Sequence, residues 1–132
     1  GSEMCIRDSV YTNHKAKLAN TSLTTIYTVP TAKTAIIKSI RVANEDTNND
    51  CNITVTLVDT GDVIYMLEKD RTIQAKRSQE LLATGNMAQD TADSSVAGPT
   101  PLIAKESEII KAQAENANDL SIIISVLEIS DV

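Results

Sequence analysis

The stretch LSIIISVLEI, residues 120–129, is the most apolar run of this 132-residue chain. It is rich in β-branched residues, which suit a pleated strand better than a helix. Successive side chains of a strand point to opposite faces. One face of this run therefore carries Leu120, Ile122, Ile124 and Val126 and is wholly apolar. We predict a core strand here.

The opposite face of the same run also carries apolar side chains, at Ile123, Leu127 and Ile129. Either a second layer of the protein covers this face, or the face packs on another copy of the chain. A monomer seldom exposes a contiguous apolar patch. We therefore predict Ile123, Leu127 and Ile129 as assembly contacts and keep the covering layer as the alternative.

Short alternating runs separated by turn residues fill most of the remaining sequence. We expect strands at 22–29, 34–44, 51–58, 63–69, 78–83, 102–103 and 108–116, with 71–75 either a further short strand or an extended connection. No segment has a convincing helical period, and seven to nine short strands are typical of a sandwich. The predicted fold is all-β, a single antiparallel β-sandwich or jelly-roll-like domain.

Three local details accompany this prediction. Strands 34–44 and 51–58 are expected to form a hairpin. Lys38 interrupts the apolar face of the first of them, which indicates a bulge near Ile37 or a rim position. In the turn DTGD, residues 59–62, Gly61 is expected to need a positive φ.

The predicted domain covers residues 22–132 and includes a long loop at 84–101 that has no period. Loops of this length are usually functional or disordered. Residues 1–21 are expected to be a flexible N-terminal segment, with 10–21 either an arm or a loosely paired edge strand. Residues 1–9, GSEMCIRDS, resemble a translated adapter and are interpreted as non-native.

Charge and composition argue against several classes of function. The chain has 12 basic and 18 acidic residues, for a net charge of −6. A phosphate-binding surface needs a basic footprint, so we expect no nucleic-acid partner. No run approaches the length of a membrane span, and we expect no membrane contact. Tyr11, Tyr27 and Tyr65 are the only aromatic residues, which weakens a lectin interpretation.

Residues with catalytic or metal-binding chemistry are few. His14 is the only histidine and falls in the N-terminal segment, where we expect a solvated side chain. Cys5 and Cys51 lack the paired spacing of a zinc site. We interpret Cys51 as a small apolar residue at the start of a strand. We therefore predict no catalytic residue, no cofactor and no metal ligand.

Two acidic loops leave one alternative open. Residues 45–50 and 59–62 are rich in side-chain oxygens, which calcium prefers as ligands. Their spacing does not match the EF-hand loop, and acidic turns are common without a metal. A divalent ion and a plain solvated turn both remain possible interpretations.

Three phrases resemble small proteins encoded by tailed bacteriophages, especially those of marine bacteria. They are LTTIYTVPTAKTAIIKSIRVAN (23–44), NITVTLVD (52–59) and ANDLSIIISVLEIS (117–130). The resemblance spans about residues 22–130 and departs from the usual pattern at 105–108, where the turn lacks glycine. It implies a non-enzymatic virion structural protein, such as a capsid-surface, tail or fibre component.

The same resemblance implies a location in the virion and, as partners, other virion proteins and copies of the chain itself. We expect a homo-oligomer. The alternative function is a receptor- or glycan-binding surface module, and an enzyme is the least favoured class. No catalytic residue comes with the resemblance.

Overall fold

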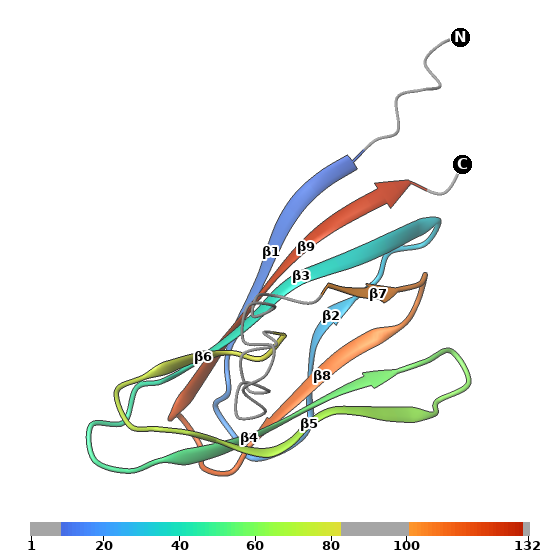
Figure 1. The fold of residues 1–132 in the computed structure, drawn as a ribbon. Helices are drawn as coiled ribbons and strands as arrows, with labels where there is room; N and C mark the ends of the chain where they lie inside the picture. The colour runs from blue at the N-terminus through green and yellow to red at the C-terminus, as the bar shows by residue number, and fades with distance from the viewer. Residues whose placement is uncertain (1–8, 83–100, 131–132) are drawn as a thin grey trace, which may run out of the picture.

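The structure is a computed structural model that describes residues 9–82 and 101–130 (Figure 1). These residues form nine strands in two antiparallel sheets and no helix, so the predicted all-β sandwich is confirmed. The strands are β1 (Ser9–Lys17), β2 (Thr24–Thr28), β3 (Lys33–Asn44), β4 (Cys51–Val58), β5 (Ile64–Ile73), β6 (Ser78–Glu80), β7 (Leu102–Ala104), β8 (Ile109–Ala114) and β9 (Leu120–Ser130).

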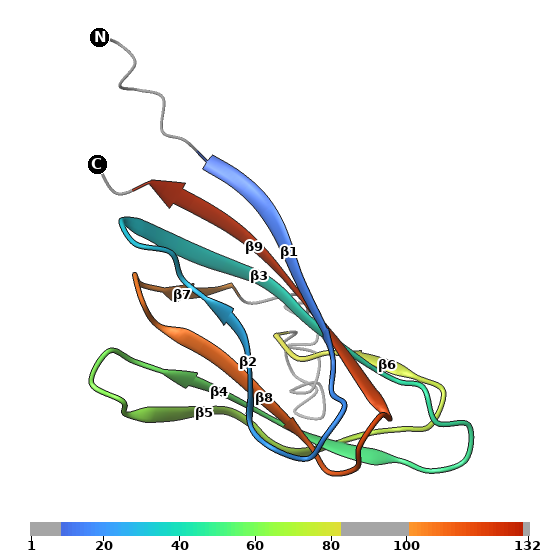
Figure 2. The same ribbon diagram turned by 180° about the vertical axis from the view of Figure 1, so that it is seen from behind.

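The first sheet has the order β1-β9-β3-β6, with β7 also paired to β3, and the second has the order β2-β8-β4-β5. The most apolar run of the sequence is β9, and it pairs with β1 on one side and β3 on the other. Seen from both sides, β1 borders the first sheet and β5 borders the second (Figures 1 and 2). Within the described residues, no helix could cross a membrane.

The core lies between the inner faces of the two sheets and consists almost entirely of aliphatic side chains. Leu120, Ile122, Ile124 and Val126 of β9 are all buried, as predicted. Fully burying one such side chain stabilises a fold by about 1.5–3 kcal/mol. The other large side chains with almost no exposure come from both sheets and the segments beside them: Leu18, Val29, Ile37, Ile40, Val42, Ile53, Val55, Ile73 and Ile110.

The expected bulge in β3 is confirmed. The register with β9 shifts between Ile37 and Ser39. The extra residue, Lys38, is exposed, while Ile37 and Ile40 on either side both face the core. The carboxylate of Glu80 in β6 accepts hydrogen bonds from the Ser39 hydroxyl and, at 2.9 Å, from the Ile40 N–H.

The predicted hairpin of residues 34–44 and 51–58 is wrong. β3 pairs with β9, β6 and β7, whereas β4 pairs with β5 and β8 in the other sheet. Both strands bury one face, and their apolar and polar residues alternate. This alternation is expected for two strands in opposite sheets that face each other across the core, and equally for two neighbours in one sheet. Buried Asn44 holds the crossing loop, because its Nδ2 donates to the Asn49 carbonyl at 3.0 Å and the Ile73 carbonyl at 2.9 Å.

The strand expected at 63–69 continues without a break into 71–73, so that β5 is one strand with register irregularities opposite Val55. In the preceding turn the prediction for Gly61 is wrong, because Asp62 takes the left-handed conformation at φ 64°. Asp59 shapes this turn, since its Oδ1 accepts from the Gly61 and Val63 amides at 2.9 and 3.0 Å. In the turn at 105–108, which contains no glycine, Ser107 takes the positive φ.

Of the two alternatives for residues 10–21, the structure has the edge strand. β1 pairs with β9 along its whole length, from Ser9 opposite Ile129 to Lys17 opposite Ser121. The predictions for residues 1–8 and for most of the loop at 84–101 fall outside the described residues.

Candidate assembly surface

An apolar row crosses the outer face of the first sheet. Tyr11 on β1 is opposite Leu127 on β9, Leu127 is opposite Ile36 on β3, and Ile36 is opposite Ile103 on β7. Residues directly opposite in a sheet point to the same side. Tyr11 is 73% exposed and Ile103 58% exposed. We call Tyr11, Leu127, Ile36 and Ile103 the apolar row.

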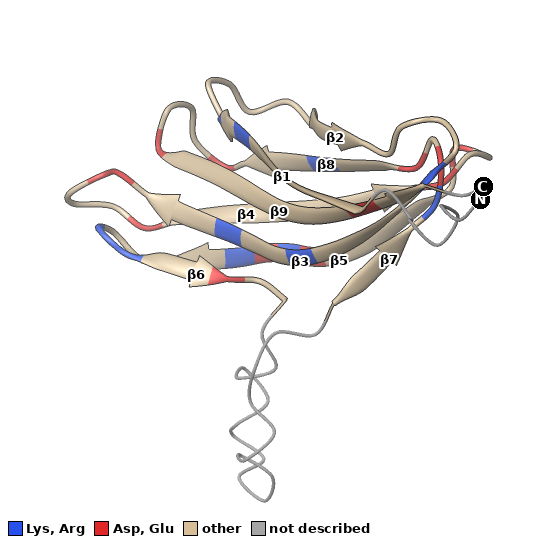
Figure 3. Ribbon diagram, turned by 90° about the horizontal axis from the view of Figure 1, so that it is seen from above, with Lys and Arg blue, Asp and Glu red and all other residues tan. Residues whose placement is uncertain are grey.

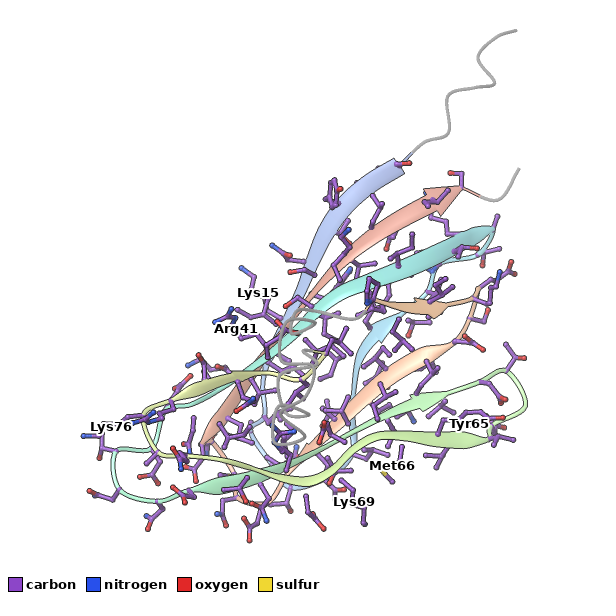
Figure 4. All side chains as sticks on the ribbon, in the orientation of Figure 1. Lys15, Arg41, Tyr65, Met66, Lys69 and Lys76 are labelled. Atoms are coloured by element: carbon purple, nitrogen blue, oxygen red, sulfur yellow. The ribbon has the colours of Figure 1, made fainter. Side chains whose placement is uncertain are left out.

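A second row lies four residues further along β1 on the same face. Lys15 is opposite Ile123, and Ile123 is opposite Arg41. Ile123 is 39% exposed. Neither Lys15 nor Arg41 forms an ion pair with another described residue. We call Lys15, Ile123 and Arg41 the basic row; Figure 4 shows Lys15 and Arg41 close together.

The three assembly contacts predicted from sequence therefore share one surface. Ile123 belongs to the basic row, Leu127 to the apolar row, and Ile129 lies opposite Thr34 at the end of the same face. Leu127 and Ile129 are half-buried. The second sheet packs on the other face of β9, so it does not cover them. Sequence reasoning missed Tyr11, Ile36 and Ile103, since their alignment with Leu127 depends on which strands pair.

A second exposed apolar segment lies on the other sheet. It consists of Val63, just before β5, and Ile64, Tyr65 and Met66 at its start, all 49% to 54% exposed. Figure 4 shows Tyr65 and Met66 on this strand, away from Lys15 and Arg41. The segment begins directly after the acidic residue Asp62. We call residues 63–66 the β5 apolar segment.

A polar cluster of buried and half-buried side chains links the two sheets. The Tyr27 hydroxyl donates to Glu128 Oε2 at 2.7 Å, and His14 Nε2 lies 4.0 Å from the same oxygen. The His14 ring packs on Tyr27 with a centroid distance of 4.3 Å, and His14 Nε2 is 2.9 Å from Thr12 Oγ1. His14 is therefore a half-buried residue of a paired strand, and its side chain is 31% exposed.

The cluster is built for packing and hydrogen bonding between the sheets. Burial, together with the hydrogen bond to Glu128 and its charge, raises the pKa of Tyr27 far above the usual range. The phenol therefore stays neutral and acts as a donor. Glu128 is 8% exposed and, like Tyr27, lies among core side chains. In a strand over residues 9–17, every second side chain points to the same face. This period places His14 on the inner face together with Thr12 and Ala16.

In the acidic loops, aspartate side chains accept hydrogen bonds from backbone amides of the same loop. The Asp46 carboxylate accepts from the amides of Asn48 and Asn49 at 2.8 and 3.2 Å. These bonds hold the pKa of Asp46 below its ordinary value. Within residues 9–82 and 101–130, no three His, Cys, Asp or Glu side chains converge as a metal site would require.

A shallow polar groove of about 450 Å³ lies on the second sheet. Its lining residues are Thr21, Asn52, Thr54, Asp70, Gln113, Ala114 and Glu115. No aromatic residue is among them, although sugar rings usually pack on aromatic faces. This groove offers little support for the glycan-binding alternative.

Charge is distributed differently on the strands and in the turns. Figure 3 shows cationic positions along β3 and acidic positions mostly in the turns between strands. The chain as a whole carries a net charge of −6. The basic row is thus a local exception on an acidic protein, and an acidic partner surface would complement it.

No protein-family model matches the chain, and neither does any curated protein. Among solved structures, the "Acidic stable capsid structure of Helicobacter pylori bacteriophage KHP30" is similar, with 14% identity, a TM-score of 0.44 and coverage of 96% of this chain and 92% of that one. A pentameric capsid protein from metagenomic phage sequences has 14% identity and a TM-score of 0.35.

A second structure of a pentameric capsid protein from metagenomic phage sequences, solved by iodide SAD phasing, has 13% identity and a TM-score of 0.33. The chain spans 59% and 62% of the two pentameric proteins, and 92% of it is matched in each. Each of these three structures is of a phage capsid or a phage capsid protein.

Proposed function

We propose that this chain is a non-enzymatic structural protein of a bacteriophage virion. In this proposal it works through contacts with copies of itself and with other virion proteins, as a capsid-surface, tail or fibre component. The observation that carries the proposal is the apolar row, which places Tyr11 and Ile103 in solvent on a sheet face that the second sheet does not cover.

Apolar side chains on an exposed sheet face are stabilised when another surface covers them. Burial of apolar surface stabilises an association by about 25 cal/mol for each Å² removed from water. The row is aligned across four strands and forms one contiguous band, rather than isolated side chains of the kind that any soluble protein exposes. Ile123 and Ile129 extend this band along β9 on the same face.

The phrases at 23–44, 52–59 and 117–130 give independent support, because they resemble virion proteins of tailed phages. In the structure these phrases build β2, β3, β4 and β9, which supply much of both inner faces. The resemblance therefore covers the parts of the chain that define the sandwich, and the apolar row lies on two of these strands.

The test is the mass of the protein in solution after a charge is placed in the row. Tyr11→Lys and Ile103→Lys change exposed side chains, so the fold should tolerate them. Loss of one buried apolar side chain should weaken self-association by about tenfold or more. Light scattering should then show more of the 14.2 kDa monomer.

The matched control is Leu23→Lys, which alters a partly exposed apolar residue just before β2. This variant should keep the parent mass. If Tyr11→Lys and Ile103→Lys both leave the mass distribution unchanged, the outer face is not the assembly surface.

A further inference from the structure

One half of the β5 edge lacks the features that normally keep a sheet edge from pairing. Edge strands carry free N–H and C=O groups, and native proteins protect them with charges, bulges, proline or short length. Residues 68–71 of β5 carry four charged side chains beside a register irregularity. The β5 apolar segment, residues 63–66, has no charge or proline and is about half exposed.

The other described edges are protected. β2 has five residues and a register shift, and β6 and β7 have three residues each. β1 is long, with nine residues and an unbroken register to β9, but it carries Lys15 and Lys17. Positive charge on β1 disfavours pairing with most strands and favours a strand that presents an acid.

We propose that the β5 apolar segment of one copy pairs with β1 of a second copy. The strands run antiparallel, with Met66 opposite Tyr11 and with Asp62, in the turn just before β5, near Lys15. The inference deepens the proposed self-assembly and rests on it, because it names the segment that meets the edge of the apolar and basic rows.

Charge complementarity supports this pairing. Asp62 precedes the apolar segment, and Lys15 follows Tyr11 at the same spacing of four residues. Antiparallel pairing with Met66 opposite Tyr11 brings the carboxylate of Asp62 toward the ammonium group of Lys15. Asp62 is exposed, and neither it nor Lys15 forms an ion pair with another described residue.

The faces of the two strands also agree. Tyr11 and Lys15 share the outer face of the first sheet with Leu127 and Ile123. On β5, Tyr65 is opposite Leu57, so Met66 and Ile64 point to the outer face of the second sheet. The pairing extends the apolar row by Met66, whose sulfur suits an aromatic neighbour, and the basic row by Asp62.

The two paired edges are different surfaces, so the contact is head-to-tail. Such contacts close into rings or continue as filaments. β1 and β5 border different sheets, as Figures 1 and 2 show, so each copy can offer both edges at once. Strand addition at a sheet edge supplies affinity through main-chain hydrogen bonds.

Cysteine cross-linking tests the register in the full chain. In a Cys5→Ser, Cys51→Ala background, one batch carries Tyr11→Cys and the other carries Met66→Cys. Mixing them under mild oxidation should give a disulfide-linked dimer, because facing strand residues lie at disulfide distance. The control replaces Tyr11→Cys with Val10→Cys, which is also exposed but points to the opposite face and should cross-link at least about tenfold more slowly.

The outcomes separate the inference from the proposed function. Rapid Tyr11→Cys to Met66→Cys cross-linking, with little from Val10→Cys, supports the pairing. An assembly that forms in solution but gives no such cross-link overturns the pairing and leaves the proposed self-assembly standing. If the Cys5→Ser, Cys51→Ala protein stays monomeric while the parent assembles, charge variants of the parent test the pairing instead. Lys15→Glu should then weaken assembly about fivefold or more, and Lys105→Glu should not.

Equal effects of Lys15→Glu and Lys105→Glu overturn the pairing, and a parent chain that is monomeric at every concentration overturns both proposals. Asp62→Asn is the matched change on the partner strand. It keeps a residue that tolerates the left-handed conformation and removes the charge. The double variant Asp62→Asn, Lys15→Met should weaken assembly no more than either single change, because both changes remove the same contact.

Discussion

The Tyr27 hydroxyl donates a 2.7 Å hydrogen bond to the Glu128 carboxylate, between residues 101 positions apart in the chain. Tyr27 belongs to β2 in the second sheet and Glu128 to β9 in the first. Both side chains are buried. This contact is a polar link across a core that is otherwise almost wholly aliphatic, and it fixes how the two sheets meet near β1.

Tyr27→Phe should destabilise the fold by about 1–3 kcal/mol, because a buried carboxylate loses its closest donor. Denaturant unfolding measures this difference. Tyr65→Phe is the control, since Tyr65 is about half exposed and its change should stay within about 0.5 kcal/mol. Equal stability of the Tyr27→Phe variant and the parent would show that the link contributes nothing.

The same contact predicts a loss of stability in alkali. Burial, the hydrogen bond to Glu128 and its charge raise the pKa of Tyr27, whereas an unfolded tyrosine titrates near pH ~10. Above that pH the unfolded chain releases a proton that the folded chain keeps. Stability therefore falls as the pH rises past about 10, by at most about 1.4 kcal/mol per pH unit from this group.

The pH measurement is best made in a Cys51→Ala background. Burial also raises the pKa of the Cys51 thiol, which would add a slope of the same sign. In that background, Tyr27→Phe should flatten the alkaline part of the stability profile. A slope that is unchanged by Tyr27→Phe would contradict the assignment.

Asn44 should be the most sensitive polar residue of the loop that crosses between the sheets. Its side chain bonds the carbonyls of Asn49 and Ile73 and accepts from the Asp46 amide at 2.9 Å. Asn44→Ala leaves these groups without their partner and should cost about 2–4 kcal/mol in unfolding experiments. Exposed Asn48→Ala is the control, and a similar loss in both variants would refute the special role of Asn44.

Thr56 and Thr54 on β4 should respond to valine in opposite directions. The Thr56 hydroxyl is buried and has no hydrogen-bond partner among the described residues, so Thr56→Val should be neutral or stabilise by about 1 kcal/mol. The Thr54 hydroxyl accepts from the Asp70 amide at 3.0 Å, and Thr54→Val should destabilise. Thermal melts of the two variants measure both changes. A destabilised Thr56→Val variant together with an unchanged Thr54→Val variant would contradict the prediction.

Sequence periodicity predicted the strands that bury one complete face. The prediction for residues 51–58 coincides with β4, and the apolar face of residues 120–126 is the buried face of β9. The bulge at Lys38 followed from one charge in an apolar alternation. In each case the information is local, since a strand's two faces can be read from its own residues.

Strand pairing could not be predicted in the same way. β9 lies between β1 and β3, which are more than 70 residues earlier in the sequence. This pairing aligns Tyr11, Leu127, Ile36 and Ile103 and brings His14 against Tyr27. Polar residues 10–17 looked like a tail because a border strand has only one buried face, and half of that face here is Thr12 and His14.

The most direct test of the central claim is quantitative mass spectrometry of density-purified phage particles that encode this chain. The account predicts that the chain is retained in the particles in many copies, at a constant ratio to the other virion proteins. It would be contradicted if the chain were abundant in the infected-cell lysate but absent from the purified particles.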